Sequence, residues 1–138
     1  MPAYFDSNIL ISVLKNDLHA EEAARLWEAH KDRVSSILLE IECRIVLRRF
    51  ANEFGKLPSG WLSSKEEWLQ QTLETIALRT IDDSIAEVIR REPLLARCRS
   101  LDAIHLATAL HFRKTSDEPF YFFTFDSRVA EMAKQLQL

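Results

Sequence analysis

The chain has 138 residues, of which 47% are hydrophobic and 28% charged, so it can bury a core and is not an intrinsically disordered protein. Its net charge of −3, from 18 Lys+Arg and 21 Asp+Glu, argues against a protein that coats nucleic acid with a broad basic surface. No run of about 20 apolar residues, no signal-peptide pattern and no cysteine framework is present, so we expect a cytoplasmic protein without a membrane contact or zinc site.

The first predicted elements are a strand and two helices. Residues 3–5 are an apolar run that stops at Asp6, which indicates a short buried strand. Asp6 or Ser7 can cap the next helix, because either side chain can accept a hydrogen bond from a free N–H of the first turn. A second helix is expected to begin near Asp17. Its apolar face follows helical spacing and consists of Ala20, Ala23, Ala24 and Trp27.

The next segment predicts a second strand followed by a long helix. Residues 33–37 have the composition of a strand and pass into a helix over residues 38–54. Gly55 is well placed to end that helix, because glycine readily adopts the left-handed conformation found just beyond helix ends. Residues 56–60 are the clearest loop.

Capping patterns indicate where the following helices begin. Ser63 and Ser64 each stand three residues before a glutamate, so two overlapping capping boxes predict a helix start there. Residues 77–81 form the predicted third strand. Asp82 or Asp83 is expected to cap the helix after it.

The last third predicts a buried helix, a strand and a terminal helix. Ser100 is the expected cap of a helix over residues 101–112, which is apolar nearly all round and therefore buried. Residues 120–125 are a continuous aromatic run, which favours a central strand buried on both faces over a base-stacking surface. Asp126 and Ser127 then cap a helix over residues 128–136.

Strands separated by helices predict one α/β domain, residues 1–138, with a central parallel sheet and helices on both faces. Active sites of such sheets lie at the carboxyl ends of the strands. Asp6 and Asp126 each follow a predicted strand, so we expect both at that edge.

Four carboxylates, those of Asp6, Glu42, Asp102 and Asp126, admit two interpretations. Singly, the first and last can be helix caps, Asp102 can stabilise the positive end of its helix, and Glu42 can be solvated. Together they are acids near buried surface, and neither Glu42 nor Asp102 has an obvious cationic partner. Acids in such places are costly to bury unpaired, and a cluster of oxygen ligands is what Mg²⁺ or Mn²⁺ requires.

At this point the sequence resembles the PIN-domain family, and within it the VapC-like ribonuclease toxins of type II toxin–antitoxin systems. The resemblance extends over essentially the whole chain. It is carried by Phe5-Asp6-Ser7-Asn8, by the stretch from Ser35 to Glu42, by Leu101-Asp102-Ala103-Ile104-His105-Leu106-Ala107-Thr108-Ala109 and by Thr124-Phe125-Asp126-Ser127-Arg128.

The resemblance implies a PIN-like three-layer α/β/α domain and a set of acidic metal ligands. The implied catalytic and metal-binding residues are Asp6, Glu42, Asp102 and Asp126. Thr124 resembles the hydroxyl that orients this cluster, and Ser7 or Asn8 can support it. Glu40 is the alternative to Glu42, and the distance from Ser36 favours Glu42.

His105 lies one helical turn after Asp102, which allows a catalytic interpretation or a structural one. The structural interpretation is favoured, because the implied chemistry needs no imidazole. Arg44, Arg48 and Arg49 share the helix of Glu42 and are interpreted as solvated surface or as contacts to RNA backbone.

The function that the resemblance implies is a Mg²⁺- or Mn²⁺-dependent endoribonuclease, the toxin of a toxin–antitoxin pair. The expected partners are an RNA substrate, a cognate antitoxin protein and a second copy of the chain. The alternatives are a PIN-fold binding or scaffold protein with little catalytic activity, and a PIN nuclease outside toxin–antitoxin systems.

Overall fold

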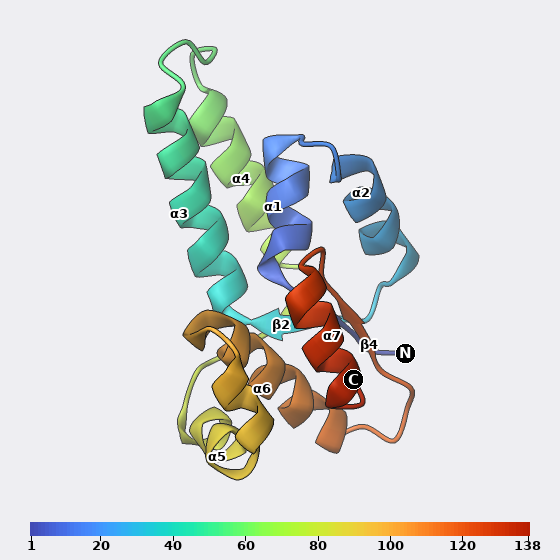
Figure 1. The fold of residues 1–138 in the computed structure, drawn as a ribbon. Helices are drawn as coiled ribbons and strands as arrows, with labels where there is room; N and C mark the ends of the chain where they lie inside the picture. Colours follow the sequence, from blue (N-terminus) through green and yellow to red (C-terminus); the bar gives the residue numbers. More distant parts are fainter.

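Four parallel strands form the central sheet of the computed structural model, which describes residues 1–138 (Figure 1). In chain order they are β1 (Ala3–Phe5), β2 (Arg33–Ser36), β3 (Ala77–Arg79) and β4 (Tyr121–Phe123). Their spatial order is β3-β2-β1-β4, so β1 has a neighbour on each side. All carboxyl ends therefore meet at one edge of the sheet.

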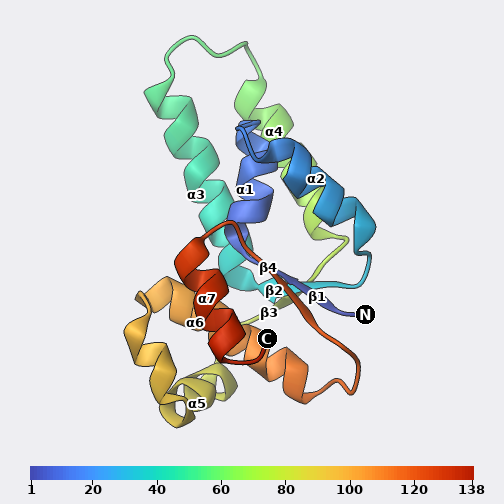
Figure 2. The ribbon, with the colours of Figure 1, turned by 45° about the vertical axis from the view of Figure 1, so that its right-hand side comes forward.

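Helices cover both faces of this sheet, which confirms the predicted α/β fold with three layers (Figures 1 and 2). One face carries α1 (Ser7–Lys15), α2 (Ala20–Ala29), α3 (Ile37–Glu53) and α4 (Trp61–Leu73). The other carries α5 (Asp83–Arg91), α6 (Ser100–Lys114), α7 (Ser127–Gln135) and the short 3₁₀ helix η1 (Pro93–Arg97). No helix combines the length and apolar character that a bilayer span requires.

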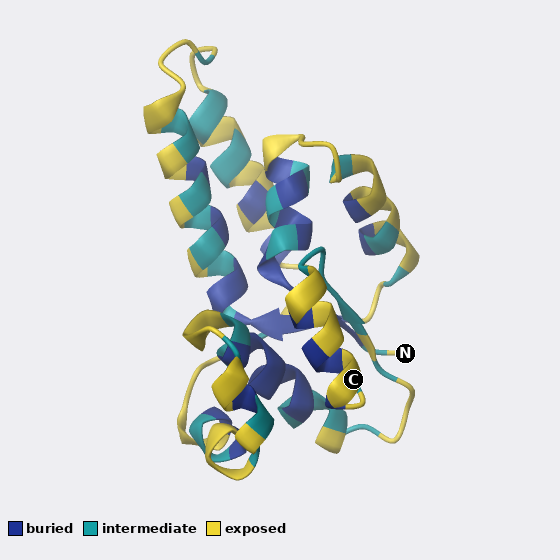
Figure 3. Cartoon of the chain, viewed as in Figure 1, coloured by how far each residue is buried: buried dark blue, intermediate teal, exposed yellow.

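Strand β1 joins the two cores of the molecule. Side chains alternate along a strand, so Ala3 and Phe5 enter the core beneath α1 to α4, and Tyr4 enters the opposite layer. All three residues are fully buried, as predicted for this strand. Tyr4 packs with Ala109 of α6, a helix whose middle, residues 105–110, is buried (Figure 3).

The prediction that residues 120–125 form a central strand is wrong. Strand β4 is shorter and lies at the edge of the sheet, where it pairs only with β1. Its aromatic residues pack inward across that one neighbour: the rings of Phe122 and Tyr4 stack with centroids 5.2 Å apart. Tyr121 remains exposed. A continuous apolar run indicates burial, but it cannot distinguish a central strand from an edge strand whose rings cover the sheet.

The predicted start of α4 at the capping boxes is also wrong. The helix begins at Trp61, after Gly60, which adopts a left-handed φ of 77° and makes no side-chain cap. The Trp61 ring stacks on Phe50 of α3, with centroids 5.2 Å apart. This contact between helices extends α4 backward past Ser63 and Ser64, so packing overrides the local capping signal.

Ser100 is the first residue of α6 and not its cap, which corrects the second capping prediction. Arg99 occupies the cap position and its side chain makes no capping hydrogen bond. The backbone N–H of Ala103 donates to the Arg99 carbonyl at 2.8 Å, which starts the helix one residue earlier than predicted. The side chains of Asp6, Asp82 and Asp126 cap their helices as predicted.

Candidate active site

Two of the predicted site acids lie at the carboxyl edge of the sheet, after the neighbouring strands β1 and β4. The backbone N–H of Asp6 donates to the Phe123 carbonyl at 3.0 Å and so continues the pairing of these strands. Asp6 Oδ1 accepts from the Ser7 backbone N–H at 2.7 Å. Asp126 Oδ1 caps α7 by accepting from the backbone N–H of Arg128 at 2.8 Å. Both acids are therefore caps, and both also face the same edge.

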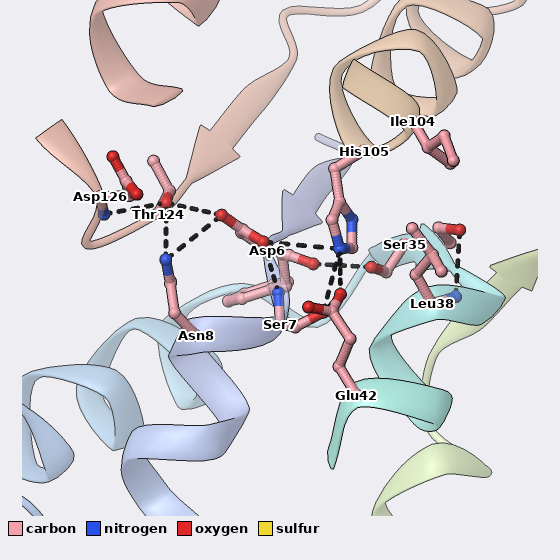
Figure 4. Close-up of polar contacts among 12 residues, drawn as sticks. Asp6, Ser7, Asn8, Ser35, Leu38, Glu42, Ile104, His105, Thr124 and Asp126 are labelled. Atoms are coloured by element: carbon pink, nitrogen blue, oxygen red, sulfur yellow. Dashed lines mark hydrogen bonds and ion pairs between the residues drawn. The ribbon is translucent and has the colours of Figure 1, made fainter. Parts of the chain in front are cut away.

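Thr124 and Asn8 hold Asp6 in place (Figure 4). The Thr124 hydroxyl donates to Asp6 Oδ2 at 2.7 Å, and Asn8 Nδ2 donates to the same oxygen at 3.2 Å. Asn8 Nδ2 also donates to Thr124 Oγ1 at 2.9 Å, and Asn8 Oδ1 accepts from the Phe125 backbone N–H at 3.0 Å. The backbone N–H of Asp126 donates to Thr124 Oγ1 at 3.1 Å. These bonds tie the start of α1 to the loop before α7.

Glu42 reaches the site from α3 and is held by Ser7 and His105 (Figure 4). The Ser7 hydroxyl donates to Glu42 Oε1 at 2.8 Å, and His105 Nε2 lies 2.8 Å from the same oxygen. Burial raises the pKa of Glu42, but the hydrogen bonds from His105 and Ser7 outweigh it, so the net pKa is below its ordinary value. The bonds therefore keep this carboxylate ionised.

His105 is buried behind Glu42, and its other ring nitrogen contacts β1. Its Nδ1 lies 2.7 Å from the Tyr4 hydroxyl, whose pKa burial raises well above the ordinary value. A Tyr4 hydroxyl that donates to Nδ1 leaves the ring proton of a neutral imidazole on Nε2, which can then donate to Glu42. His105 is buried, as expected for a structural histidine, yet its side chain also contacts Glu42, one of the site acids. In the sequence, the only feature that relates His105 to the site acids is its spacing of one helical turn from Asp102.

Asp102, in the first turn of α6, makes no side-chain hydrogen bond and no ion pair, unlike the other site acids. Its pKa is raised by partial burial first, and then by the negative charges of Asp6 and Asp126. The pKa of Asp6 is also raised, mainly by burial, although His105, Thr124 and Ser7 oppose the shift. Asp102 is therefore close enough to Asp6 and to Asp126 to be repelled by each of them.

Glu40 and Glu42 face different neighbours. Glu40 Oε2 accepts from Arg44 Nε at 2.7 Å, and Arg44 also donates to Gln70 of α4 at 2.7 Å. Glu40 is thus engaged between α3 and α4, whereas Glu42 contacts Ser7 and His105. The arrangement supports the choice of Glu42 over Glu40.

A comparison with models of protein families identifies the family of this chain. The family model described as the PIN domain matches residues 3–135. The chain belongs to the PIN-domain family. PIN domains are generally nucleases and typically use divalent metals. A comparison with curated proteins found no match.

The donors of this PIN domain fit a hard divalent cation by their chemistry. Asp6, Asp102, Asp126 and Glu42 supply carboxylate oxygens, and no Lys or Arg forms an ion pair with any of them. In the side-chain arrangement of the structure, no three His, Cys, Asp or Glu side chains form a group that could hold a metal ion. Some of the carboxylate oxygens accept hydrogen bonds within the protein, as Glu42 Oε1 does from Ser7.

A pocket of roughly 440 Å³ opens beside the aspartates, between the starts of α6 and α7. Asp102 and Asp126 line it together with Arg97, Arg99 and Arg128. These arginines were not among the predicted site residues. Their spacing in the sequence shows no periodic pattern, and only the fold brings Arg128 to the other two.

Proposed function

We propose that this PIN domain is a metal-dependent endoribonuclease and the toxin of a type II toxin–antitoxin pair. The observation that carries the nuclease proposal is the position of Asp102 near Asp6 and Asp126, the two acids that follow β1 and β4 at the carboxyl edge of the sheet. Asp102 forms no ion pair, and its pKa is raised in part by Asp6 and Asp126. Such mutual repulsion is relieved when a divalent cation binds among the acids.

In this proposal Asp6, Asp102 and Asp126 hold Mg²⁺ or Mn²⁺, with Glu42 as the fourth acid. A bound cation would neutralise charge on the scissile phosphate and lower the pKa of the attacking water. Thr124 and Asn8 orient Asp6 through the hydrogen bonds at Oδ2. Ser7 and His105 keep Glu42 ionised and pointed at the site.

The proposed substrate is single-stranded or loop RNA, cut internally to leave a 5′ phosphate and a 3′ hydroxyl. This choice rests on the resemblance to VapC-like toxins. The unpaired arginines beside Asp102 and Asp126 support a polyanionic substrate, because a guanidinium group can bind phosphate oxygens with two parallel hydrogen bonds.

A cleavage assay tests the nuclease proposal. Structured RNA, single-stranded DNA and a chromogenic phosphate ester are each incubated with Mn²⁺, with Mg²⁺ and with EDTA. The proposal expects RNA to be cut internally with metal and to stay intact with EDTA. Cleavage of DNA alone would move the protein to another class of PIN nuclease, and metal-dependent RNA binding without any cleavage would favour a binding or scaffold protein.

The toxin proposal predicts partners and a phenotype. The partners are an antitoxin that places a basic side chain among the acids and a second copy of the chain, in the cytoplasm. Expression in bacteria should arrest growth, and co-expression of a cognate antitoxin should restore it. Normal growth with soluble, folded protein that cleaves RNA in vitro would reject the toxin role and keep the nuclease.

A further inference from the structure

The pocket between α6 and α7 joins charged and apolar side chains in one space. Three arginines, Arg97, Arg99 and Arg128, line it beside two aspartates. Phe125, Val129 and Met132 supply its apolar lining. Its volume of roughly 440 Å³ lies within the range of small-ligand sites, about 300–1,000 Å³.

The arginines of the pocket differ from most others in the chain because their side chains make no hydrogen bond or ion pair. Arginines elsewhere bind acids or carbonyls: Arg44 pairs with Glu40, for example, and Arg90 pairs with Asp83 and Glu87. The arginines without a hydrogen bond or ion pair are Arg49, Arg97, Arg99 and Arg128, and only Arg49 lies outside the pocket. Unpaired donors are thus concentrated at one place.

The helix geometry adds to the positive potential of this pocket. Helix α6 begins at Ser100, and its cap residue Arg99 offers no side-chain acceptor to the first turn. The backbone N–H groups there, at the positive end of the helix dipole, favour an anion. Asp102 and Asp126 oppose this potential unless a cation neutralises them.

We propose that this pocket binds one nucleotide of the RNA strand, next to the scissile phosphate. The arginines bind phosphate oxygens, and the surface of Phe125 and Met132 contacts the base or ribose. An isolated phosphate would use only the charged part of the pocket, whereas a nucleotide uses both parts. The identity of the polymer rests on the proposed function, but the pocket itself rests on these contacts.

Binding of labelled single-stranded RNA in EDTA tests the pocket without cleavage. Asp102 and Asp126 are unchanged in all the proteins compared and oppose binding equally in each, so the difference between the proteins reports on the arginines. The test variant combines Arg97→Gln, Arg99→Gln and Arg128→Gln, and the control is Lys56→Gln, which removes an exposed positive charge from the loop after α3. We expect the triple variant to bind about tenfold more weakly or worse. Its plot of log K against log salt should flatten by roughly 0.7 for each lost phosphate contact. The control should change little.

Cys98 provides a second measurement inside the pocket. It lines the pocket and is partly exposed, whereas Cys43, the other cysteine, is fully buried. Burial and the nearby Asp102 raise the pKa of the Cys98 thiol, so alkylation is followed at alkaline pH. RNA and a nucleoside monophosphate should slow alkylation of wild type and should not slow that of the triple variant.

Each outcome supports or overturns the pocket. Equal weakening by Lys56→Gln, unchanged binding by the folded triple variant, or the absence of Cys98 protection by RNA would overturn the pocket. Protection of Cys98 by an acidic peptide but not by RNA would reject the nucleotide as its ligand. Wild type that never cleaves RNA, together with weakened binding in the triple variant, would reject the proposed function and keep the pocket. Cleavage of RNA by wild type, together with unchanged RNA binding by the triple variant, would reject the pocket and keep the proposed function.

Discussion

The acids of the site divide into two regions that differ in how the protein treats their charge. Around Glu42, donors from Ser7 and His105 engage the carboxylate and lower its pKa (Figure 4). Around Asp102, no side chain donates to the carboxylate, and partial burial and neighbouring acids raise its pKa. The carboxylate of Glu42 is thus satisfied by donors within the protein, whereas that of Asp102 is not.

This difference suggests a division of roles between the two regions. A carboxylate held by two fixed donors keeps its orientation whether or not a ligand is present. A carboxylate without donors is destabilised by its acidic neighbours. A bound cation would remove this repulsion, so the relief contributes to the free energy of cation binding. We therefore expect substitutions in the Asp102 region to act mainly on metal and activity, and those near Glu42 to act mainly on stability and orientation.

The largest expected effect is the loss of cleavage in Asp102→Asn. Asp102 makes no hydrogen bond or ion pair within the protein, so the substitution removes charge without breaking a contact. We expect metal-dependent cleavage of RNA to fall by more than about a hundredfold. Glu40→Gln is the matched control, because Glu40 faces Arg44 and lies outside the site. Cleavage by folded Asp102→Asn at the wild-type rate would remove Asp102 from the metal site.

The next effect is on stability with and without metal. Mn²⁺ at a hundredfold excess over Kd should stabilise wild type by about 2.7 kcal/mol and Asp102→Asn much less. In EDTA, the variant should be as stable as wild type or more stable, because it relieves repulsion by Asp6 and Asp126. Thermal melts over a series of Mn²⁺ concentrations measure both effects. A wild-type melting temperature that ignores metal would contradict the shared site.

A smaller effect is expected for Tyr4→Phe, in the region around Glu42. The substitution removes the hydroxyl that contacts His105 Nδ1 at 2.7 Å and leaves a buried polar atom without its partner. We expect a loss of about 1–2 kcal/mol in the free energy of unfolding, measured by denaturant titration in EDTA. Metal affinity should change less than in Asp102→Asn. The reverse order of effects would show that the two regions do not differ in role.

The smallest effect is the pH dependence of the metal-free protein. The folded-state pKa of Asp102 is raised, so its protonated form stabilises the fold below the ordinary aspartate pKa of about 3.9. That contribution is lost as the pH rises through the raised folded value. The stability of wild type relative to Asp102→Asn should therefore fall with rising pH across this window. Parallel melts in EDTA measure it, and a pH-independent difference would argue against the raised pKa.

Much of the local structure could be predicted from the sequence because its causes are local. The buried run Ala3–Phe5 forms β1, and Asp6, Asp82 and Asp126 cap the helices that follow them. A carboxylate beside a free N–H needs no distant partner to act as a cap. The alternation of strands and helices likewise indicated the parallel sheet, and thus the edge where Asp6 and Asp126 lie.

Other features were decided only by tertiary structure, because they depend on which elements become neighbours. The contact between Tyr4 and His105 joins residues 101 positions apart. The edge position of β4 depends on strand order, and the start of α4 depends on the stacking of Trp61 on Phe50. In the same way, Arg128 meets Arg97 and Arg99 only because α6 and α7 begin beside one pocket. Local sequence determines what a segment can form, whereas packing between segments determines which side chains meet.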